Sequence, residues 1–126
     1  MVNKVIYVGR IVAKPVMSNT TKNTEVVNFR LAVEETWKNG DGNLKRNTEY
    51  IRCVAWGKLA RTIVTFLDKG DVIYVEGRTK KAKSFDEKTN TKYEVDEAHI
   101  KYMKMIVTKG KVAAEELPPL PEDVPF

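Results

Sequence analysis

The sequence contains very little cysteine and histidine: Cys53 and His99 are the only residues of their kinds among 126. One cysteine cannot form a disulfide within the chain, which agrees with a reducing compartment. A structural zinc site usually has four protein ligands, most of them Cys or His. We therefore expect no metal site, and we expect Cys53 to be a core residue and His99 to be an ordinary strand residue.

Long apolar runs and catalytic motifs are missing as well. No run of 18 apolar residues occurs, so we expect no membrane-spanning helix. The first residues, MVNKVIYVGRIVAKP, alternate like a strand and lack the cleavage site of a signal peptide. The seven glycines match neither a P-loop nor a dinucleotide fingerprint, and no pair of acids stands out as general acid and base. These absences favour a cytoplasmic protein that has no cofactor and is not an enzyme.

Positive charge is concentrated in the first 111 residues. All 22 Lys and Arg lie at or before Lys111, the net charge is +5, and four acids follow Lys111. A basic body attracts polyanions such as nucleic acid. A basic surface that serves only solubility is the alternative that charge alone leaves open.

The hydrophobic pattern predicts a chain made mostly of strands. Five segments with alternating or β-branched residues are expected to be strands: 3–12, 26–36, 48–56, 71–83 and 92–107. Apolar residues at helical spacing predict a short helix over 58–67, closed by Lys69 and Gly70. The intervening segments 37–47 and 84–91 are expected to be a turn and a loop.

This order of elements predicts the fold and the domain boundaries. Three strands, one helix and two strands match an all-β, five-stranded Greek-key OB-fold barrel with one short helix between strands 3 and 4. An open sandwich is the competing architecture. Residues 1–109 would form this domain. Residues 110–126 hold four of the five prolines and show no periodicity, which predicts a disordered tail.

The segment TEYIRCVAWGKLA, residues 48–60, separates into two faces when it is read with a period of two. One face carries Ile51, Cys53 and Ala55, and the other carries Tyr50, Arg52, Val54 and Trp56. A half-buried strand normally places polar side chains outside, but here two aromatic rings flank an arginine. Same-face residues lie about 7 Å apart, which leaves room for bases to stack on the rings at about 1–3 kcal/mol each. Arg52 would pair with phosphate.

Further aromatic and basic residues follow the same pattern. Trp37 and Phe85 are candidate exposed rings in the predicted turn and loop. The basic residues that we expect to contact nucleic acid from neighbouring segments are Lys58, Lys69, Arg78, Lys80 and Lys83. Each has a simpler explanation. Trp56 would pack in the core if the register slipped by one residue, Trp37 would cap the barrel, Phe85 would anchor its loop, and the basic run 78–83 would be a solvated surface.

Seven short motifs, in order along the chain, carry a family likeness: residues 3–9 (NKVIYVG), 27–32 (VNFRLA), 48–52 (TEYIR), 56–60 (WGKLA), 69–70 (KG), 74–78 (YVEGR) and 122–126 (EDVPF). Through them the sequence resembles the bacterial single-stranded DNA-binding protein family over nearly its whole length. The resemblance implies an OB-fold assembled as a homotetramer. It also implies a protein that coats single-stranded DNA without sequence preference in replication, recombination and repair, in the cytoplasm and associated with the nucleoid.

The resemblance also implies which residues bind DNA. Trp37, Tyr50 and Trp56 match family positions that stack bases, and Lys4, Arg52, Lys58, Lys69 and Lys83 match positions that are typically basic. Some positions depart from the family pattern. Ser84 stands where a tryptophan is common, with Phe85 one residue late; Ile51 replaces a common histidine, and Arg10 replaces a common asparagine and adds a cation for phosphate.

The last five residues resemble the family's docking peptide for replication and repair proteins: Glu122, Asp123, Val124, Pro125 and Phe126. Pro125 would stiffen this tip and Phe126 would fill an apolar pocket of a partner. The long Gly- and Gln-rich linker common in the family is absent before it, and a merely solubilising tail is the alternative. The competing functions are an OB-fold primosome accessory or RNA-binding module, a small enzyme on the same fold, and an adaptor that acts through its tail.

Overall fold

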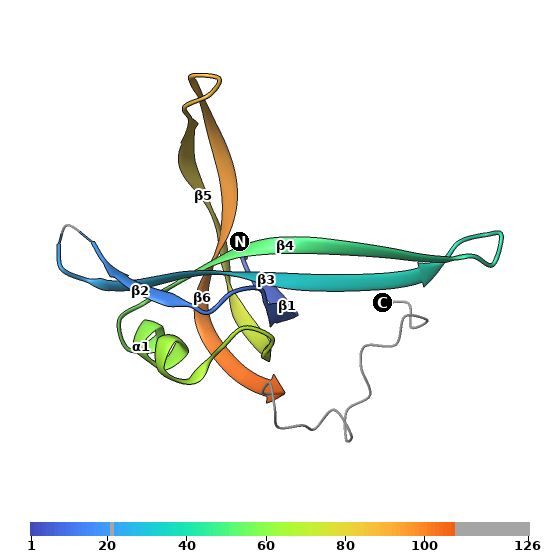
Figure 1. Ribbon diagram of the computed structural model, residues 1–126, viewed down its shortest axis with the longest axis horizontal. Helices are drawn as coiled ribbons and strands as arrows, with labels where there is room; N and C mark the ends of the chain where they lie inside the picture. The colour runs from blue at the N-terminus through green and yellow to red at the C-terminus, as the bar shows by residue number, and fades with distance from the viewer. Residues whose placement is uncertain (21, 108–126) are drawn as a thin grey trace.

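A computed structural model describes residues 1–20 and 22–107 of the chain. The predicted tail at 110–126, with its tip, lies outside the described residues. The elements follow in the order β1 (Val5–Ile11), β2 (Val16–Asn19), β3 (Glu25–Lys38), β4 (Leu44–Trp56), α1 (Gly57–Phe66), β5 (Val72–Asp86) and β6 (Thr91–Val107) (Figure 1).

The strands form one sheet that closes on itself. Its order is β1-β5-β6-β4-β3-β2, and an additional pairing of β1 with β3 closes β1, β5, β6, β4 and β3 into a barrel. Among the strands of the described residues, only β4 and β6 pair in parallel; the other pairs are antiparallel. The short β2 continues along the edge of β3 that β1 leaves after Ile11, because the segment around the buried Pro15 interrupts the edge strand. The prediction of a closed five-stranded OB-fold barrel, with one helix between its third and fourth strands, is confirmed.

The core fills the barrel and reaches one face of the helix. Alternate residues of the barrel strands point inward, and Ala60 and Ile63 of α1 are buried with them. The helix packs on β2, β3 and β4. The strand residues of the core are Ile11, Val27, Phe29, Leu31, Cys53, Ala55, Ile73, Val75, Ala98 and Ile100. Within the described residues, no helix has the length and apolar character needed to cross a bilayer.

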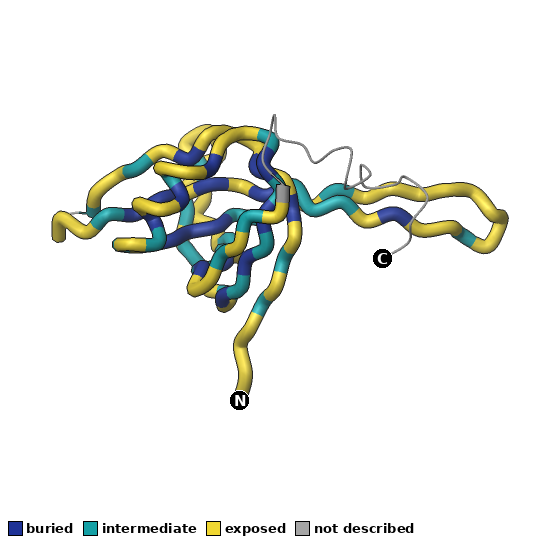
Figure 2. Tube along the Cα trace, turned by 90° about the horizontal axis from the view of Figure 1, so that it is seen from below, coloured by how far each residue is buried: buried dark blue, intermediate teal, exposed yellow. Residues whose placement is uncertain are grey.

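Two hairpins extend beyond the barrel. The β3–β4 hairpin and the β5–β6 hairpin project in different directions from it (Figure 1), and buried residues are concentrated in the barrel body (Figure 2). The β3–β4 hairpin closes at a tip formed by residues 39–43, where the side chain of Asn39 accepts hydrogen bonds from the backbone N–H groups of Asp41 and Asn43. The two hairpins therefore present long, largely exposed ribbons beyond the core.

Both predicted loop segments were too long. The β3–β4 ladder continues through Trp37 and Lys45, so Trp37 lies on a strand and not in a turn. The β5–β6 ladder likewise continues through Phe85 and Lys92, so the prediction that Phe85 lies in a loop was wrong. Cross-strand hydrogen bonds satisfy the backbone of these polar segments, which outweighs their weak strand propensity.

The predicted closure of the helix by Lys69 and Gly70 was wrong. The helix stops at Phe66, and the Leu67 N–H donates to the carbonyl of Ile63. Gly70, with φ of 92°, lies in the following turn and donates its N–H to Ile11 instead of capping the helix.

Candidate nucleic-acid interface

Strand β4 turns opposite faces to the core and to solvent, as its period of two predicts. Cys53 and Ala55 are buried in the barrel, whereas Tyr50 is 61% and Trp56 43% exposed on the other face. The predicted assignment of the two rings to the outer face is confirmed. Val54 departs from the pattern, being only 4% exposed, because β3 and β6 flank it on both sides through its pairing with Asn28 and His99.

Cys53 belongs to the inner face and is chemically quiet. Its side chain is enclosed in the core, and this burial raises the pKa of the thiol to about 12. The thiol therefore stays protonated at neutral pH, whereas a cysteine nucleophile needs the thiolate.

Trp56 sits at the junction of β4 and α1. Gly57, with φ of 60°, turns the chain directly from the strand into the helix, a conformation that glycine adopts without strain. The indole ring contacts the ring of His99, with centroids 6.3 Å apart and planes inclined by 42°. His99 in turn has its Nε2 atom 3.3 Å from Oε1 of Glu97. Trp56 is thus supported at one side and open to solvent at the other.

Arg10, Ala32 and Tyr50 form one row across three strands. Arg10 of β1 pairs with Ala32 of β3, and Ala32 pairs with Tyr50 of β4. Cross-strand partners share a face, so Arg10 and Tyr50 lie on either side of a small alanine on the outer surface, and the Arg10 guanidinium donates to the carbonyl of Gly70 at 3.0 Å. Neighbouring strands lie about 4.8 Å apart, which places the two larger residues about 10 Å from each other. The structure brings Arg10 to the aromatic residues.

The next row carries two arginines. Arg30 of β3 pairs directly with Arg52 of β4, so two like charges share one cross-strand position on the outer face. Such a pair is destabilising in isolation, and neither guanidinium makes an ion pair within the described part of the chain. An anion that bridges them would relieve the repulsion. We call the outer surface formed by Arg10, Arg30, Tyr50, Arg52 and Trp56 the aromatic face.

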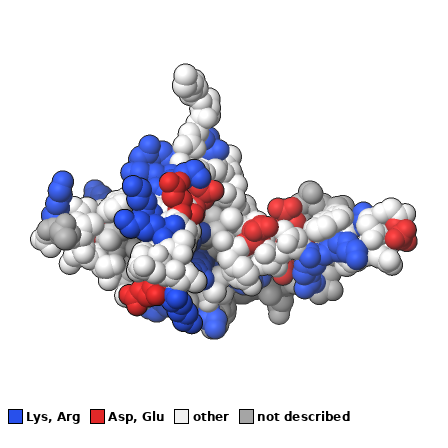
Figure 3. Space-filling model, turned by 90° about the horizontal axis from the view of Figure 1, so that it is seen from above, with Lys and Arg blue, Asp and Glu red and all other residues white. Residues whose placement is uncertain are grey.

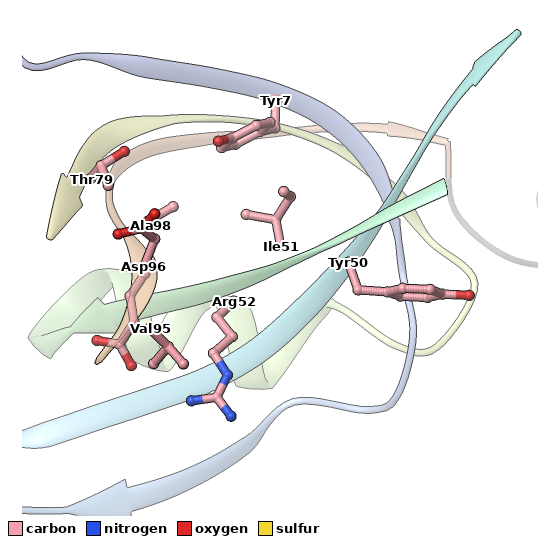
Figure 4. A pocket seen from close by; sticks show the side chains of 9 residues that line it. Tyr7, Tyr50, Ile51, Arg52, Thr79, Val95, Asp96 and Ala98 are labelled. Carbon is pink, nitrogen blue, oxygen red and sulfur yellow. The ribbon is translucent and has the colours of Figure 1, made fainter. Parts of the chain in front are cut away.

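A groove opens beside this face where β4 and β6 separate. The two strands pair only at Cys53–Ala98 and Val54–His99. Beyond that point lies an open hollow of about 350 Å³, lined by Tyr7, Thr79, residues 50–52 and residues 95–98. Ile51 points into the hollow, and Tyr50 extends away from it (Figure 4). Asp96 and Glu97 add acidic groups to its lining, and Arg52 adds a cation.

The β5–β6 hairpin, called the arm below, supplies further cations. Arg78 pairs with His99 and Lys80 with Glu97, which places both cations on the same face of the sheet as His99 and Trp56. In Figure 3, Lys and Arg gather around this hairpin, with a smaller group of acids among them. Within the described residues neither Arg78 nor Lys80 makes an ion pair. The arm therefore extends the aromatic face with positive charge.

Three residues predicted to bind DNA lie on other sides of the ribbons. Trp37 is exposed, but its partner is Lys45 and its parity places it on the opposite side of the β3–β4 ribbon from Tyr50. Lys83 and Phe85 are exposed on the side of the arm opposite to Arg78 and Lys80. No bulge lies between Arg78 and Phe85 to correct this register.

The remaining predicted cations lie around the barrel. Lys4 pairs with Glu76 at 3.8 Å, so its charge is partly neutralised. Lys58 is exposed in the first turn of α1, two residues after Trp56. Lys69 is exposed beside Gly70, whose carbonyl accepts a 3.0 Å hydrogen bond from Arg10. Lys58 and Lys69 therefore lie at the borders of the aromatic face, whereas Lys4 is held in an ion pair.

Sequence reasoning missed Arg30 and His99 as members of this surface. Arg30 alternates with the buried Phe29 and Leu31, so the period of β3 already indicated that it faces outward. The contact of His99 with Trp56 depends on the parallel pairing of β4 and β6, which no local pattern reveals. The described residues contain no group of three or more His, Cys, Asp or Glu arranged to hold a metal ion.

The chain is similar to known proteins over most of its length. Residues 2–106 match the single-strand binding protein family. The chain is 39% identical over 107 residues to single-stranded DNA-binding protein 1 of Chlorobaculum tepidum, covering 85% of this chain and 66% of that protein. It is 42% identical over 83 residues to single-stranded DNA-binding protein 1 of a Streptococcus pyogenes strain, covering 64% of this chain and 62% of that protein. The matches thus span less than two thirds of these relatives.

Among solved structures, the chain resembles a Plasmodium falciparum SSB in complex with ssDNA. The TM-score is 0.74 with 23% sequence identity, and the match covers 84% of this chain and 96% of that one. At this identity the likeness shows the shared barrel fold. Together with the match over residues 2–106, it leads to one conclusion: the chain belongs to the single-strand binding protein family.

Proposed function

We propose that the chain is a non-enzymatic protein that binds single-stranded DNA without sequence preference and coats exposed strands in replication, recombination and repair. The observation that carries the proposal is the aromatic face, where Tyr50 and Trp56 are exposed on either side of Arg52. A protein with this role would lie in the cytoplasm, associated with the nucleoid.

The mechanism combines stacking with charge neutralisation. Bases stack on Tyr50 and Trp56, a contact that tolerates any base because every base has a π-face. Phosphates pass between Arg30 and Arg52, which lack ion-pair partners within the described residues. The exposed ring of Trp37 lies on the side of the β3–β4 hairpin opposite to Tyr50. It stacks a base where the DNA passes around the edge of this hairpin.

The test is a fluorescence titration with poly-thymidine at two salt concentrations. Both tryptophans of the chain, Trp37 and Trp56, are exposed, so stacking should quench their emission. The logarithm of the binding constant should fall with the logarithm of salt concentration, with a slope of about −0.7 per neutralised phosphate. Unchanged emission, with no binding detected by filter retention, would overturn the proposal.

A comparison of nucleic acids separates the main alternative. An OB-fold primosome accessory or RNA-binding module would bind an oligouridine strand as tightly as an oligothymidine strand of equal length, or more tightly. We expect the DNA strand to be preferred. Incubation with end-labelled strands also tests for an enzyme, since the proposal requires that the strands stay intact.

The proposal includes docking of replication and repair proteins on residues 122–126, which lie outside the described residues. Its support is the sequence Glu-Asp-Val-Pro-Phe, which combines charge with an apolar end. Deletion of these five residues should leave the affinity for oligothymidine unchanged and abolish competition with a synthetic peptide of the same sequence for a replication or repair protein. A deletion that changes neither property would favour a purely solubilising tail.

We also propose that the chain assembles as a homotetramer. The outer wall formed by β1, β5 and β6 exposes Ile6, Val8 and Tyr102, and Tyr102 contacts Tyr74 edge-on with centroids 6.2 Å apart. The Tyr74 hydroxyl donates to Glu76, and this hydrogen bond is the main cause that raises the pKa of Tyr74. Glu76 lies between Ile6 and Tyr102 in the sheet, and Lys4 partly neutralises it at 3.8 Å. Exposed apolar side chains gathered in this way are typical of an interface, and a second copy of the chain would cover them.

A further inference from the structure

Tyr93 is an exposed ring in the first part of β6 that none of the predicted contacts includes. Its side chain is 42% exposed in the arm. The hydroxyl of Ser84 donates to the phenol oxygen of Tyr93 over 3.1 Å, and the two residues are direct cross-strand partners. This hydrogen bond fixes the tip of the ring and leaves its face open to a ligand.

The strand register connects Tyr93 to the aromatic face. The β5–β6 pairing runs without a shift from Arg78–His99 to Ser84–Tyr93. Tyr93 and His99 are six residues apart, an even number, so they lie on the same face of the ribbon. His99 contacts Trp56. One continuous surface, turning with the twist of the ribbon, therefore leads from Trp56 past Arg78 and Lys80 to Tyr93.

Phe85 provides the comparison within the same hairpin. It is the partner of Lys92, so its side chain lies on the opposite side of the ribbon from Tyr93. Charge does not decide between the two sides of the arm. Arg78 and Lys80 lie on the side of Tyr93, and Lys83 and Lys92 lie beside Phe85 on the other side. Continuity does decide, because only the side of Tyr93 leads to the aromatic face through His99.

The separation suits a polynucleotide. Six residues of extended strand span about 20 Å, so Tyr93 lies well beyond the reach of a nucleotide stacked on Trp56. Single-stranded sites on OB-folds cover about 4–16 nucleotides, a length that reaches both rings. Glu97, the acid on the path, is held by His99 at 3.3 Å.

We propose that Tyr93, held at its hydroxyl by Ser84, stacks a base of the bound DNA at the outer end of the arm. The proposal deepens the proposed function and rests on it. It assigns the arm one stacking position, Tyr93, on the face of Arg78 and Lys80, and none to Phe85.

Two experiments test this assignment. In the first, a long oligothymidine is titrated into wild-type protein and into Tyr93→Leu, Tyr93→Phe and Phe85→Leu. We expect Tyr93→Leu to weaken binding about tenfold, and Tyr93→Phe and Phe85→Leu to bind like the wild type.

In the second experiment, unmodified protein is irradiated with an oligomer that carries 5-iodouracil, and the crosslinked peptide is identified by mass spectrometry. Besides crosslinks at Tyr50 and Trp56, we expect a crosslink in the arm at Tyr93 and none at Phe85.

The outcomes are distinguishable from failure of the proposed function. If the wild type binds and Phe85→Leu is the weaker variant, or if crosslinks fall on Phe85, the assignment of Tyr93 is overturned while DNA binding stands. Wild-type protein that binds no oligothymidine overturns the proposed function itself. The crosslink needs no variant, so a fold defect in Tyr93→Leu cannot obscure the result.

Discussion

The indole of Trp56 has two environments that a core residue would not have. One side contacts His99 and the other side is open, although the strand that carries it is packed in the barrel on its inner face. An aromatic ring left in water forfeits the stabilisation that burial would give it. A base that covers the open side of the ring recovers part of that free energy. The ring therefore contributes more to the free energy of DNA binding than to the free energy of folding.

Replacing Trp56 with alanine should therefore separate binding from stability. We expect the affinity for oligothymidine to fall by about 1–3 kcal/mol, with the far-ultraviolet circular dichroism spectrum unchanged. Phe66→Ala is the matched control, because Phe66 is also an exposed aromatic but lies on α1; its DNA affinity should not change. Unfolding of Trp56→Ala would instead show that the ring is part of the core.

Cys53 gives a prediction about the stability of the fold and not about DNA binding. Burial raises the pKa of its thiol from 9.0 to about 12. Between these two values the unfolded chain loses the thiol proton and the folded chain keeps it, so the stabilisation is complete below pH 9 and is lost as pH rises toward 12. The free energy of unfolding should fall by up to about 1.4 kcal/mol per pH unit over this window.

The measurement is urea denaturation at several pH values from 8 to 11. Cys53→Ala should show a shallower decline than the wild type, because lysines and tyrosines titrate equally in both proteins. Labelling with a thiol reagent at pH 8 should be slow in the folded wild type and fast in urea. Equal slopes and rapid labelling of the folded protein would show that the thiol is accessible.

Strand alternation predicted the elements that form the barrel, because each has one buried and one exposed face. The faces of β4 were predictable for this reason, with Tyr50 and Trp56 outside and Cys53 and Ala55 inside. Val54 escaped the prediction, because its cover comes from His99 on a strand more than 40 residues away in sequence. Local periodicity carries no information about such a neighbour.

The outer parts of the β3–β4 and β5–β6 hairpins were harder to predict, since their residues are polar on both sides. Trp37 and Phe85 were expected in loops because Gly, Asn, Asp and Lys surround them, yet both lie in ladders. Once the strand is known to continue, the sequence does predict which residues share a face. Phe85 lies on the face opposite to Arg78, and Ser84 lies on the same face as Lys80. The partnership of Ser84 with Tyr93 required the exact length of the hairpin, which the structure supplies.

Gly77 tests the junction between barrel and arm. The β5–β6 register shifts between Glu76 and Gly77, and a Cβ atom at Gly77 would overlap the carbonyl oxygen of His99. Since the obstacle is backbone, Gly77→Ala should lower the free energy of unfolding in urea by about 1–3 kcal/mol. It should also weaken DNA binding by displacing His99 beneath Trp56.

Gly40→Ala is the control for this element, because nothing lies within 4 Å of a Cβ atom at that hairpin tip. Its midpoint of unfolding should match that of the wild type. Equal stability of Gly77→Ala and Gly40→Ala would mean that the β5–β6 junction yields easily and does not fix the position of His99.

For the whole molecule, the barrel has two outer surfaces of different character. The aromatic face combines rings with cations, whereas the wall of β1, β5 and β6 exposes Ile6, Val8 and Tyr102. On this wall Lys4 is paired with Glu76, and Lys104 is the exposed cross-strand partner of Tyr74. The wall thus offers DNA fewer unpaired cations than the aromatic face does, and we propose that the two surfaces serve different ligands. Self-association through the apolar wall would leave the aromatic face of every copy open.

Val8→Lys should consequently break the assembly without unfolding the chain, because the side chain is exposed and its cross-strand partner is Tyr74. Light scattering coupled to size-exclusion chromatography should show a tetramer for the wild type and a smaller species for the variant. Val16→Lys, an exposed valine on β2, is the control and should stay tetrameric. Poly-thymidine should still quench the tryptophan fluorescence of Val8→Lys, because each copy keeps its own aromatic face. The smaller assembly should cover fewer nucleotides than the tetramer does. A wild type that is monomeric, or a Val8→Lys variant of unchanged mass, would show that the apolar wall is not the interface between copies.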